Sequence, residues 1–258
     1  MSSSPRTSGA RVTRPSEREI AESLIKFAKS LSSNVSRLKF GPPVAYVYNP
    51  LDYAWDAHEA YLRAYADSRK RVVFFGMNPG PFGMVQTGVP FGEIAAVRDW
   101  LKIKARVGKP AIECPKRPVE GFDCKRSEVS GFRLWGLFAK RYPKAVDFFA
   151  EHFVANYCPL AFMEEGGRNL TPDKLPLKVR TELLTACNEH LQAAISALKP
   201  EWLIGIGGFA AERAREVLPE NTPIKIGQIA HPSPANPAAN RNWAETAESQ
   251  LKQLGVWT

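Results

Sequence analysis

The chain has 258 residues, 44% of them hydrophobic and 10% aromatic, which is enough apolar material for a folded core and excludes a wholly disordered or fibrous protein. Thirty-five Lys and Arg residues against 26 Asp and Glu residues leave a formal net charge of +9, which favours polyanionic partners, with nucleic acid ahead of a membrane surface. The longest apolar runs, such as residues 72–75, are far shorter than the roughly 20 residues that cross a bilayer, so no membrane partner is expected.

In chain order, residues 1–15 come first and are rich in Ser, Pro, Gly and Arg. They predict a disordered basic tail or, as a lesser alternative, an organelle transit peptide. Residues 16–258 are expected to form a single domain. A helix is predicted to begin at Ser16, where Glu19 completes a capping box, and residues 39–49 are predicted to form a loop.

Strand and helix patterns alternate after that loop. Four short apolar runs have the unbroken character of strands buried on both faces: residues 72–75, 153–155, 202–206 and 224–229. Helical spacing predicts helices over residues 131–142, 184–198, 209–217 and 243–254. The alternation predicts an α/β fold with a parallel sheet flanked by helices.

Most of the excess positive charge is local. Residues 102–144 contain twelve Lys and Arg against four Asp and Glu, a net charge of +8. Such a run is either a solvated face or a surface that follows the phosphates of a nucleic acid.

No metal site is predicted. The four cysteines, Cys114, Cys124, Cys158 and Cys187, form no CxxC pair. His58, His152 and His190 are expected in helical contexts as structural or surface residues, without metal-ligand partners at useful spacing. The sparse cysteines indicate a reducing, intracellular compartment, which would be the nucleus in a eukaryote or the cytoplasm and nucleoid in a bacterium.

Unusual sequences follow three of the four predicted strands. Ligands of open parallel sheets bind just beyond the carboxyl ends of the strands. A stretch rich in Gly and Pro, residues 76–93, follows the first strand, residues 156–160 follow the second, and residues 231–237 follow the last. We therefore expect four residues from these stretches to lie on one rim: Asn78, Phe91, Asn156 and His231.

These side chains suit a pyrimidine pocket. An Asn amide offers one acceptor and two donors to a base edge, and a Phe ring offers a face on which a base can stack. His231 could donate a hydrogen bond to an oxygen on which negative charge develops, and Asn78 could hold a water molecule. Glu93 is the one carboxylate in these stretches, so a strong general base is not favoured.

Two motifs carry a family resemblance. Residues 76–93, GMNPGPFGMVQTGVPFGE, and residues 231–237, HPSPANP, resemble the signature motifs of single-strand-selective monofunctional uracil-DNA glycosylases, and the resemblance extends from about residue 74 to 243. It implies the fold of the uracil-DNA glycosylase superfamily, three layers α/β/α around a mainly parallel four-stranded sheet. It also implies a monomeric base-excision-repair enzyme that removes uracil and 5-substituted uracils, such as 5-hydroxymethyluracil, from single- and double-stranded DNA without a cofactor.

The resemblance also implies residue roles. Asn78 would position the hydrolytic water and His231 would stabilise the departing uracil anion, while Phe91 would stack on the base and Asn156 would bind its Watson–Crick edge. Met77 would line the pocket, and Gly80 and Met84 would shape a water site beside C5. DNA contacts are expected from two stretches, through Arg168, Lys174, Lys178 and Arg180 in the first and Ser233, Asn236 and Arg241 in the second.

One position departs from the family pattern, and other functions stay open. Ala235 stands where better-known members carry Arg, so single-stranded or mismatched DNA is expected to be handled more easily than a stable duplex. No Lys lies in the motifs to form a Schiff base, so strand cleavage is not expected. The alternatives are a glycosylase for xanthine or hypoxanthine, a non-catalytic nucleic-acid-binding module, and a dinucleotide-binding oxidoreductase suggested by the G-x-G-x-x-A pattern of residues 205–210.

Overall fold

A parallel four-stranded sheet lies at the centre of the computed structural model, which describes residues 17–237 and 239–258. Its strands are β2 (Val72–Gly76), β3 (His152–Asn156), β6 (Trp202–Ile206) and β7 (Lys225–Ile229), in the order β3-β2-β6-β7. Each strand matches a predicted run to within one residue at either end. All three pairings are parallel, so the predicted sheet is confirmed.

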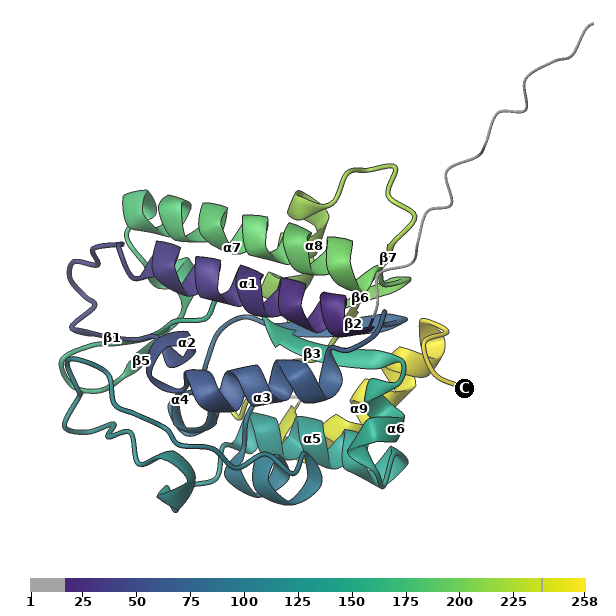
Figure 1. Cartoon of the computed structure of the whole chain (residues 1–258), viewed down its shortest axis with the longest axis horizontal. Helices are drawn as coiled ribbons and strands as arrows, with labels where there is room; N and C mark the ends of the chain where they lie inside the picture. Colours follow the sequence, from purple (N-terminus) through teal and green to yellow (C-terminus); the bar gives the residue numbers. More distant parts are fainter. Residues whose placement is uncertain (1–16, 238) are drawn as a thin grey trace, which may run out of the picture.

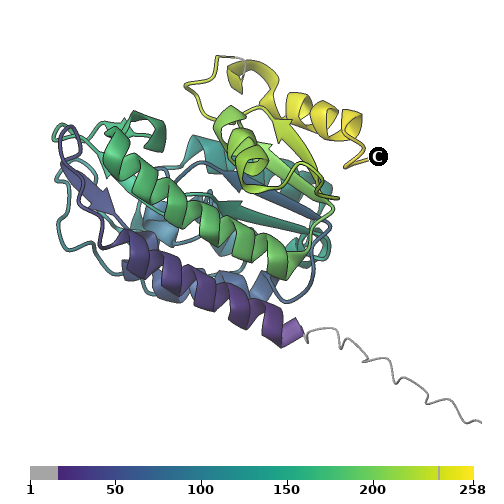
Figure 2. The ribbon, with the colours of Figure 1, turned by 90° about the horizontal axis from the view of Figure 1, so that it is seen from above.

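Helices cover both faces of this sheet. Figure 1 shows α1 (Glu17–Val35) and α7 (Leu177–Leu198) above it, and α3 (Trp55–Tyr65), α5 (Val129–Arg141) and α9 (Ala239–Gln253) below it. Figure 2 shows α1 and α7 running side by side. The shorter helices are α2 (Pro50–Tyr53), α4 (Met84–Thr87), α6 (Ala145–Phe149) and α8 (Gly208–Val217). The three-layer α/β/α arrangement expected from the resemblance is confirmed.

Several elements differ from their sequence-based limits. Helix α7 begins at Leu177, seven residues before the predicted stripe, and α9 begins at Ala239 but is interrupted at Asn242, whose backbone is not helical (φ −136°, ψ 58°). His152 lies at the start of β3, so its predicted helical context is wrong. The prediction for residues 1–15 and the exact start of the first helix at Ser16 fall outside the described residues.

A second, antiparallel sheet was not predicted. It consists of β1 (Tyr46–Tyr48), β4 (Ala161–Met163) and β5 (Asn169–Leu170), and β1 lies within the predicted loop 39–49. Single turns of π- and 3₁₀-helix occur at Ala96–Trp100, Gly121–Asp123 and Pro172–Lys174. Strands of two or three residues are too short to show a hydrophobic period, because one alternation is the most they can contain.

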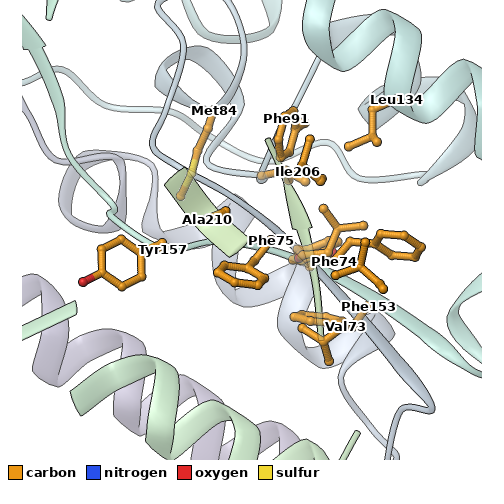
Figure 3. Close-up of a cluster of buried hydrophobic side chains, with 14 of the residues drawn as sticks. Val73, Phe74, Phe75, Met84, Phe91, Leu134, Phe153, Tyr157, Ile206 and Ala210 are labelled. Atoms are coloured by element: carbon orange, nitrogen blue, oxygen red, sulfur yellow. The ribbon is translucent and has the colours of Figure 1, made fainter. Parts of the chain in front are cut away.

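The strand register brings the ends of the sheet strands together. Gly76 pairs with Asn156, and Ile206 pairs with Ile229, so the carboxyl ends of all four strands form one edge. The chain passes from β2 to β3 on one side and returns to β6 on the other, which opens a crevice at the carboxyl edge, the usual binding position in such sheets. In Figure 3, Phe91 and Met84 lie beyond this edge, above the core side chains Phe74 and Phe75 of β2.

None of the described helices is both long and apolar enough to span a membrane.

All four histidines of the chain are held in the neutral form by burial. His58 Nδ1 lies 2.8 Å from the carbonyl oxygen of Gly88, and His152 Nδ1 lies 3.0 Å from that of Phe148. Loss of solvent lowers the pKa of His58, His152, His190 and His231 from 6.5 to about 4. Between these two values the unfolded chain binds more protons than the folded protein.

We therefore predict a steep loss of stability as the pH falls from 6.5 towards 4. In this window each histidine lowers the free energy of unfolding by up to about 1.4 kcal/mol for each pH unit, because proton uptake favours the unfolded state. Burial raises the pKa of Glu128, so protonation of this carboxyl group stabilises the folded state as the pH falls and partly offsets the effect of the histidines. Urea unfolding at pH 4.5, 5.5, 6.5 and 8 should give midpoints that are flat above pH 6.5 and decline below it. An unchanged midpoint at pH 4.5 would contradict the prediction.

Candidate active site

A cavity of about 320 Å³ opens at the carboxyl edge of the parallel sheet. This volume lies within the range of small-molecule pockets, roughly 300–1,000 Å³. Its walls are formed by residues from several separate segments: Met77, Asn78, Pro79, Gly80, Pro81, Phe91, Glu128, Ser130, Asn156, Asn169, Thr171, His231 and Ser233. The four residues expected on one rim, Asn78, Phe91, Asn156 and His231, thus line the same space.

Asn78 presents an acceptor to the cavity. It follows β2 by two residues, and its Nδ2 donates a hydrogen bond of 3.2 Å to the carbonyl oxygen of Leu160, at the start of the β4 segment. Since this carbonyl accepts only from the NH₂ end, the amide orientation is fixed and Oδ1 is left for another donor. That donor can be a water molecule.

His231 presents a donor to the same cavity. Its Nδ1 accepts a hydrogen bond of 3.1 Å from the backbone N–H of Ser233, and burial lowers its pKa to about 4. A neutral ring that accepts at Nδ1 carries its proton at Nε2. His231 therefore acts as an uncharged hydrogen-bond donor at neutral pH.

The backbone around His231 is anchored from three helices. Trp243 Nε1 in α9 donates to the carbonyl oxygen of Ala230 at 2.7 Å, and Arg133 in α5 donates to that of Pro232 at 2.7 Å. The third anchor comes from α8, since the backbone N–H of Gly207, its capping residue, donates to the carbonyl oxygen of Ile229 at 2.8 Å. These contacts hold the ring position before any ligand arrives, as electrostatic catalysis requires.

Gly207 makes room for the His231 ring. Its φ is +91°, and a Cβ there would lie 3.1 Å from His231 Cβ and 3.3 Å from Cδ2. The G-x-G-x-x-A pattern thus serves helix and strand packing, because a Cβ on Gly205 would lie 2.4 Å from the backbone nitrogen of Ala211. This geometry leaves the dinucleotide fingerprint without support.

We predict that Gly207→Ala displaces His231 from its place in the cavity wall and lowers the rate of any reaction that depends on this ring about tenfold or more, since a small displacement of a reacting group is costly. The strained φ should also reduce stability by about 1–3 kcal/mol. Gly208→Ala is the matched control, because a Cβ there meets no atom within 4 Å. Measuring kcat and the melting temperature of both variants tests this, and equal kcat values would refute the displacement.

Phe91 forms a wall of the cavity in a strained backbone conformation. Its φ is +53°, and its carbonyl oxygen accepts a hydrogen bond of 3.0 Å from Trp135 Nε1. The ring packs on Gly76, where a Cβ would lie only 2.4 Å from Phe91 Cζ. The ring centroids of Phe91 and His231 are 6.3 Å apart. The strain is maintained by the surrounding contacts, as is common at functional sites.

Asn156 carries an unsatisfied acceptor. Its Nδ2 lies 3.2 Å from the sulfur of Met84, and its Oδ1 is buried without a hydrogen-bond partner among the described residues. A buried acceptor without a partner is costly, and a ligand N–H would satisfy it. A thioether is a weak acceptor, so the contact with Met84 orients this amide only weakly.

The carboxylate of the site is Glu128, which the sequence analysis missed. Burial raises its pKa, and its two oxygens accept hydrogen bonds from the backbone N–H groups of Ser130 (3.2 Å) and Gly131 (2.8 Å) at the start of α5. Glu93, in contrast, does not line the cavity and accepts from the Ala96 N–H and the Ser127 hydroxyl. An acidic residue three positions before the predicted helix 131–142 was the available signal, since helix caps are often acidic.

Three further polar wall residues were also missed. Ser130 belongs to α5, and Asn169 and Thr171 belong to the β5 segment of the antiparallel sheet. Because that sheet was not predicted, nothing in the sequence placed this segment beside Asn78.

The remaining predicted residues fall in different places. Met77 and Gly80 line the cavity, whereas Met84 is buried behind Asn156 and does not. Ser233 lines the cavity, and Asn236 donates to the carbonyl oxygen of His231 at 3.2 Å. The predicted DNA-binding cations Arg168, Lys174, Lys178 and Arg241 are exposed, while Arg180 is half-buried and donates to the carbonyl oxygen of Asp173 at 2.7 Å.

Among residues 17–237 and 239–258, no three His, Cys, Asp or Glu side chains gather as possible metal ligands.

Comparisons with known proteins agree with the motifs. The family model of the uracil DNA glycosylase superfamily matches residues 63–252. Single-strand selective monofunctional uracil-DNA glycosylases from Rattus norvegicus, Mus musculus and Bos taurus are 45%, 44% and 43% identical over 243 residues, which is 94% of this chain and 87%, 87% and 89% of theirs. A crystal structure of SMUG2 from Pedobacter heparinus has a TM-score of 0.66 at 18% identity and covers 92% of this chain and 99% of its own, which supports the fold. The chain therefore belongs to the uracil DNA glycosylase superfamily and, within it, to the single-strand selective monofunctional uracil-DNA glycosylases.

Proposed function

We propose that this protein hydrolyses the N-glycosidic bond of uracil and of 5-substituted uracils such as 5-hydroxymethyluracil in single- and double-stranded DNA. It leaves an abasic site without cutting the strand, as a step of base excision repair. The observation that carries the proposal is the pairing of a fixed acceptor, Asn78 Oδ1, with a fixed neutral donor, His231 Nε2, in one cavity with Phe91 and Asn156.

The reaction follows from this arrangement. The extruded uracil stacks on Phe91, and its N3–H donates to the unsatisfied Oδ1 of Asn156. The bond between the sugar carbon and the base nitrogen breaks with its electron pair on uracil, and His231 donates to the oxygen that gains the charge. Water held by Asn78 adds its hydroxyl to the sugar carbon, and its proton ends on the uracil anion.

The polar groups of the cavity favour a dissociative order of events. An amide is too weak a base to activate water strongly, and both oxygens of Glu128 already accept backbone hydrogen bonds. Water therefore attacks a sugar cation that has already formed. No lysine lines the cavity to form a Schiff base with the opened sugar, which supports monofunctional chemistry.

The same proposal includes the setting of the reaction. Every residue given a role in the reaction belongs to this chain, and we propose that the protein acts as a monomer. The four cysteines are buried free thiols, which fits an intracellular enzyme acting on DNA in the nucleus or nucleoid. Ala235 is exposed in the loop after His231, where its methyl group is too small to fill a gap in a duplex, so single strands are the better substrate.

The direct test incubates the protein, in EDTA, with single-stranded and duplex oligonucleotides that carry one uracil, 5-hydroxymethyluracil, hypoxanthine or cytosine. We expect breakage only after hot alkali, fastest for uracil in single strands, and no release of cytosine, whose base edge mismatches Asn156. Breakage without alkali would contradict monofunctional chemistry. Release of hypoxanthine alone would replace the proposed substrate with a deaminated purine.

A further inference from the structure

The basic segment found in the sequence lies beside the cavity, and most of its cations are given no part in the reaction described above. It runs over residues 102–144, and two of its residues, Glu128 and Ser130, are cavity walls. Its loop before α5 is therefore close to any DNA strand that places a base in the cavity.

A buried glutamine fastens this loop to the first motif. Gln86 is 1% exposed, and its Nε2 donates to the carbonyl oxygens of Pro81 and Pro118, both at 3.0 Å. Its Oε1 accepts from the backbone N–H groups of Glu120 (2.8 Å) and Gly121 (3.1 Å). The amide uses its full hydrogen-bonding capacity, so the loop is held rigidly against the cavity wall.

Two arginines of the loop lie over the ring of Phe82, the residue after Pro81 in the cavity wall. The guanidinium carbon of Arg126 lies 4.0 Å from the centre of the Phe82 ring, and that of Arg117 lies 5.3 Å from it. Arg117 is anchored by a hydrogen bond of 3.0 Å from its Nε to the carbonyl oxygen of Gly167. The Arg126 guanidinium makes no hydrogen bond or ion pair with another described residue.

A cation–π contact with the ring uses none of the guanidinium N–H donors, so they stay free for another acceptor. A planar fork of donors held in this way matches the geometry of a phosphate. Contact with the Phe82 ring already restricts the rotamers of the exposed arginine side chain. Binding a phosphate therefore costs less conformational entropy.

We propose that Phe82, Arg126 and Arg117 form a phosphate-binding site for the DNA strand that flanks the nucleotide in the cavity. The proposal rests on the function proposed above, and it gives the basic segment a role in holding single strands. The Arg126 guanidinium supplies the free donors, and Phe82 orients it.

The test compares Arg126→Gln with Arg215→Gln, which removes the same charge from an exposed position near the end of α8, a helix that contributes no residue to the cavity wall. Binding to a fluorescent single strand with a tetrahydrofuran abasic site is measured by anisotropy over a salt series. Losing one phosphate contact should lower the slope of log affinity against log salt by about 0.7. Affinity at low salt should fall about three- to tenfold in Arg126→Gln and stay at the wild-type value in Arg215→Gln.

A second variant tests the stacking itself. Phe82→Leu keeps apolar bulk but removes the ring face, and it should weaken binding in the same way, with the double variant no weaker than Arg126→Gln alone. Unchanged slopes in Arg126→Gln would overturn the site, and additive losses would overturn the role of Phe82. Wild-type uracil release is measured on the same preparation. If release is absent while the slope still falls, the proposed function fails and the phosphate site stands.

Discussion

Replacing His231 with alanine is expected to slow uracil release about 100- to 1,000-fold, or roughly 2.7–4 kcal/mol in the barrier, by analogy with the loss of an oxyanion-hole donor. The reason is geometric: the Ser233 N–H occupies Nδ1, so Nε2 is the one donor that this ring offers to the departing base. Single-turnover rates on a uracil-containing single strand measure the effect. Since the interaction develops in the transition state, the rate should fall with little change in substrate affinity.

The protonation state of His231 provides a second readout. With a pKa of about 4, the ring stays neutral across the working range, and the wild-type rate should be flat between pH 6 and 9. Below about pH 4.5, a proton at Nδ1 removes the acceptor for the Ser233 N–H and disturbs the ring position. A rate that changes with a midpoint near 6.5 would show that the imidazolium is the active form and would contradict the neutral-donor mechanism.

Replacing Asn78 with alanine should reduce the rate by a similar factor, about 100- to 1,000-fold, because the attacking water loses its positioning acceptor. Asn78 is half-buried and makes one strong contact, to the Leu160 carbonyl, so thermal stability should change little. A melting temperature close to wild type would separate this chemical loss from unfolding.

Asn78→Asp is the informative companion variant. A carboxylate is the better base, but its second oxygen would replace Nδ2 and face the Leu160 carbonyl at about the present 3.2 Å. Two acceptors repel, so the side chain should turn away and the rate should fall despite the greater basicity. An Asp variant faster than wild type would show that basicity, and not the orientation fixed by Leu160, limits the reaction.

The sequence predicts the site residues that follow long strands and does not predict those on very short strands. Asn78 and His231 each stand two residues beyond a strand of the parallel sheet. The strand before Asn78 is apolar and buried throughout, as predicted. The expectation of burial on both faces is wrong for the strand before His231, because β7 is the edge strand and exposes Lys225 and Gln228. Their convergence at one sheet edge follows from the parallel order. The residues on short elements were not predictable in this way: Asn169 and Thr171 follow from a sheet whose strands are two or three residues long.

Glu128 is a second kind of site residue that the sequence did not predict. It lies 50 residues after Asn78 in the chain, within a loop whose charge pattern alone predicts only solvent exposure or phosphate contact. Its approach to Gly80 and Gly83, where added Cβ atoms would lie 3.4 Å and 3.0 Å from its side chain, depends on how α5 packs. Local periodicity contains no information on that packing.

By itself, the sequence determined the class of fold, the family and the residue types that can hold a pyrimidine and its leaving charge. These depend on local patterns: hydrophobic runs, Gly and Pro frames, and motif order. The tertiary structure alone decided which atoms of the cavity residues are left available to a ligand, namely Asn78 Oδ1, His231 Nε2 and Asn156 Oδ1, and it placed Arg126 over Phe82. The physical reason is that an amide or imidazole is oriented by its hydrogen-bond partners, and these partners come from segments distant in the chain.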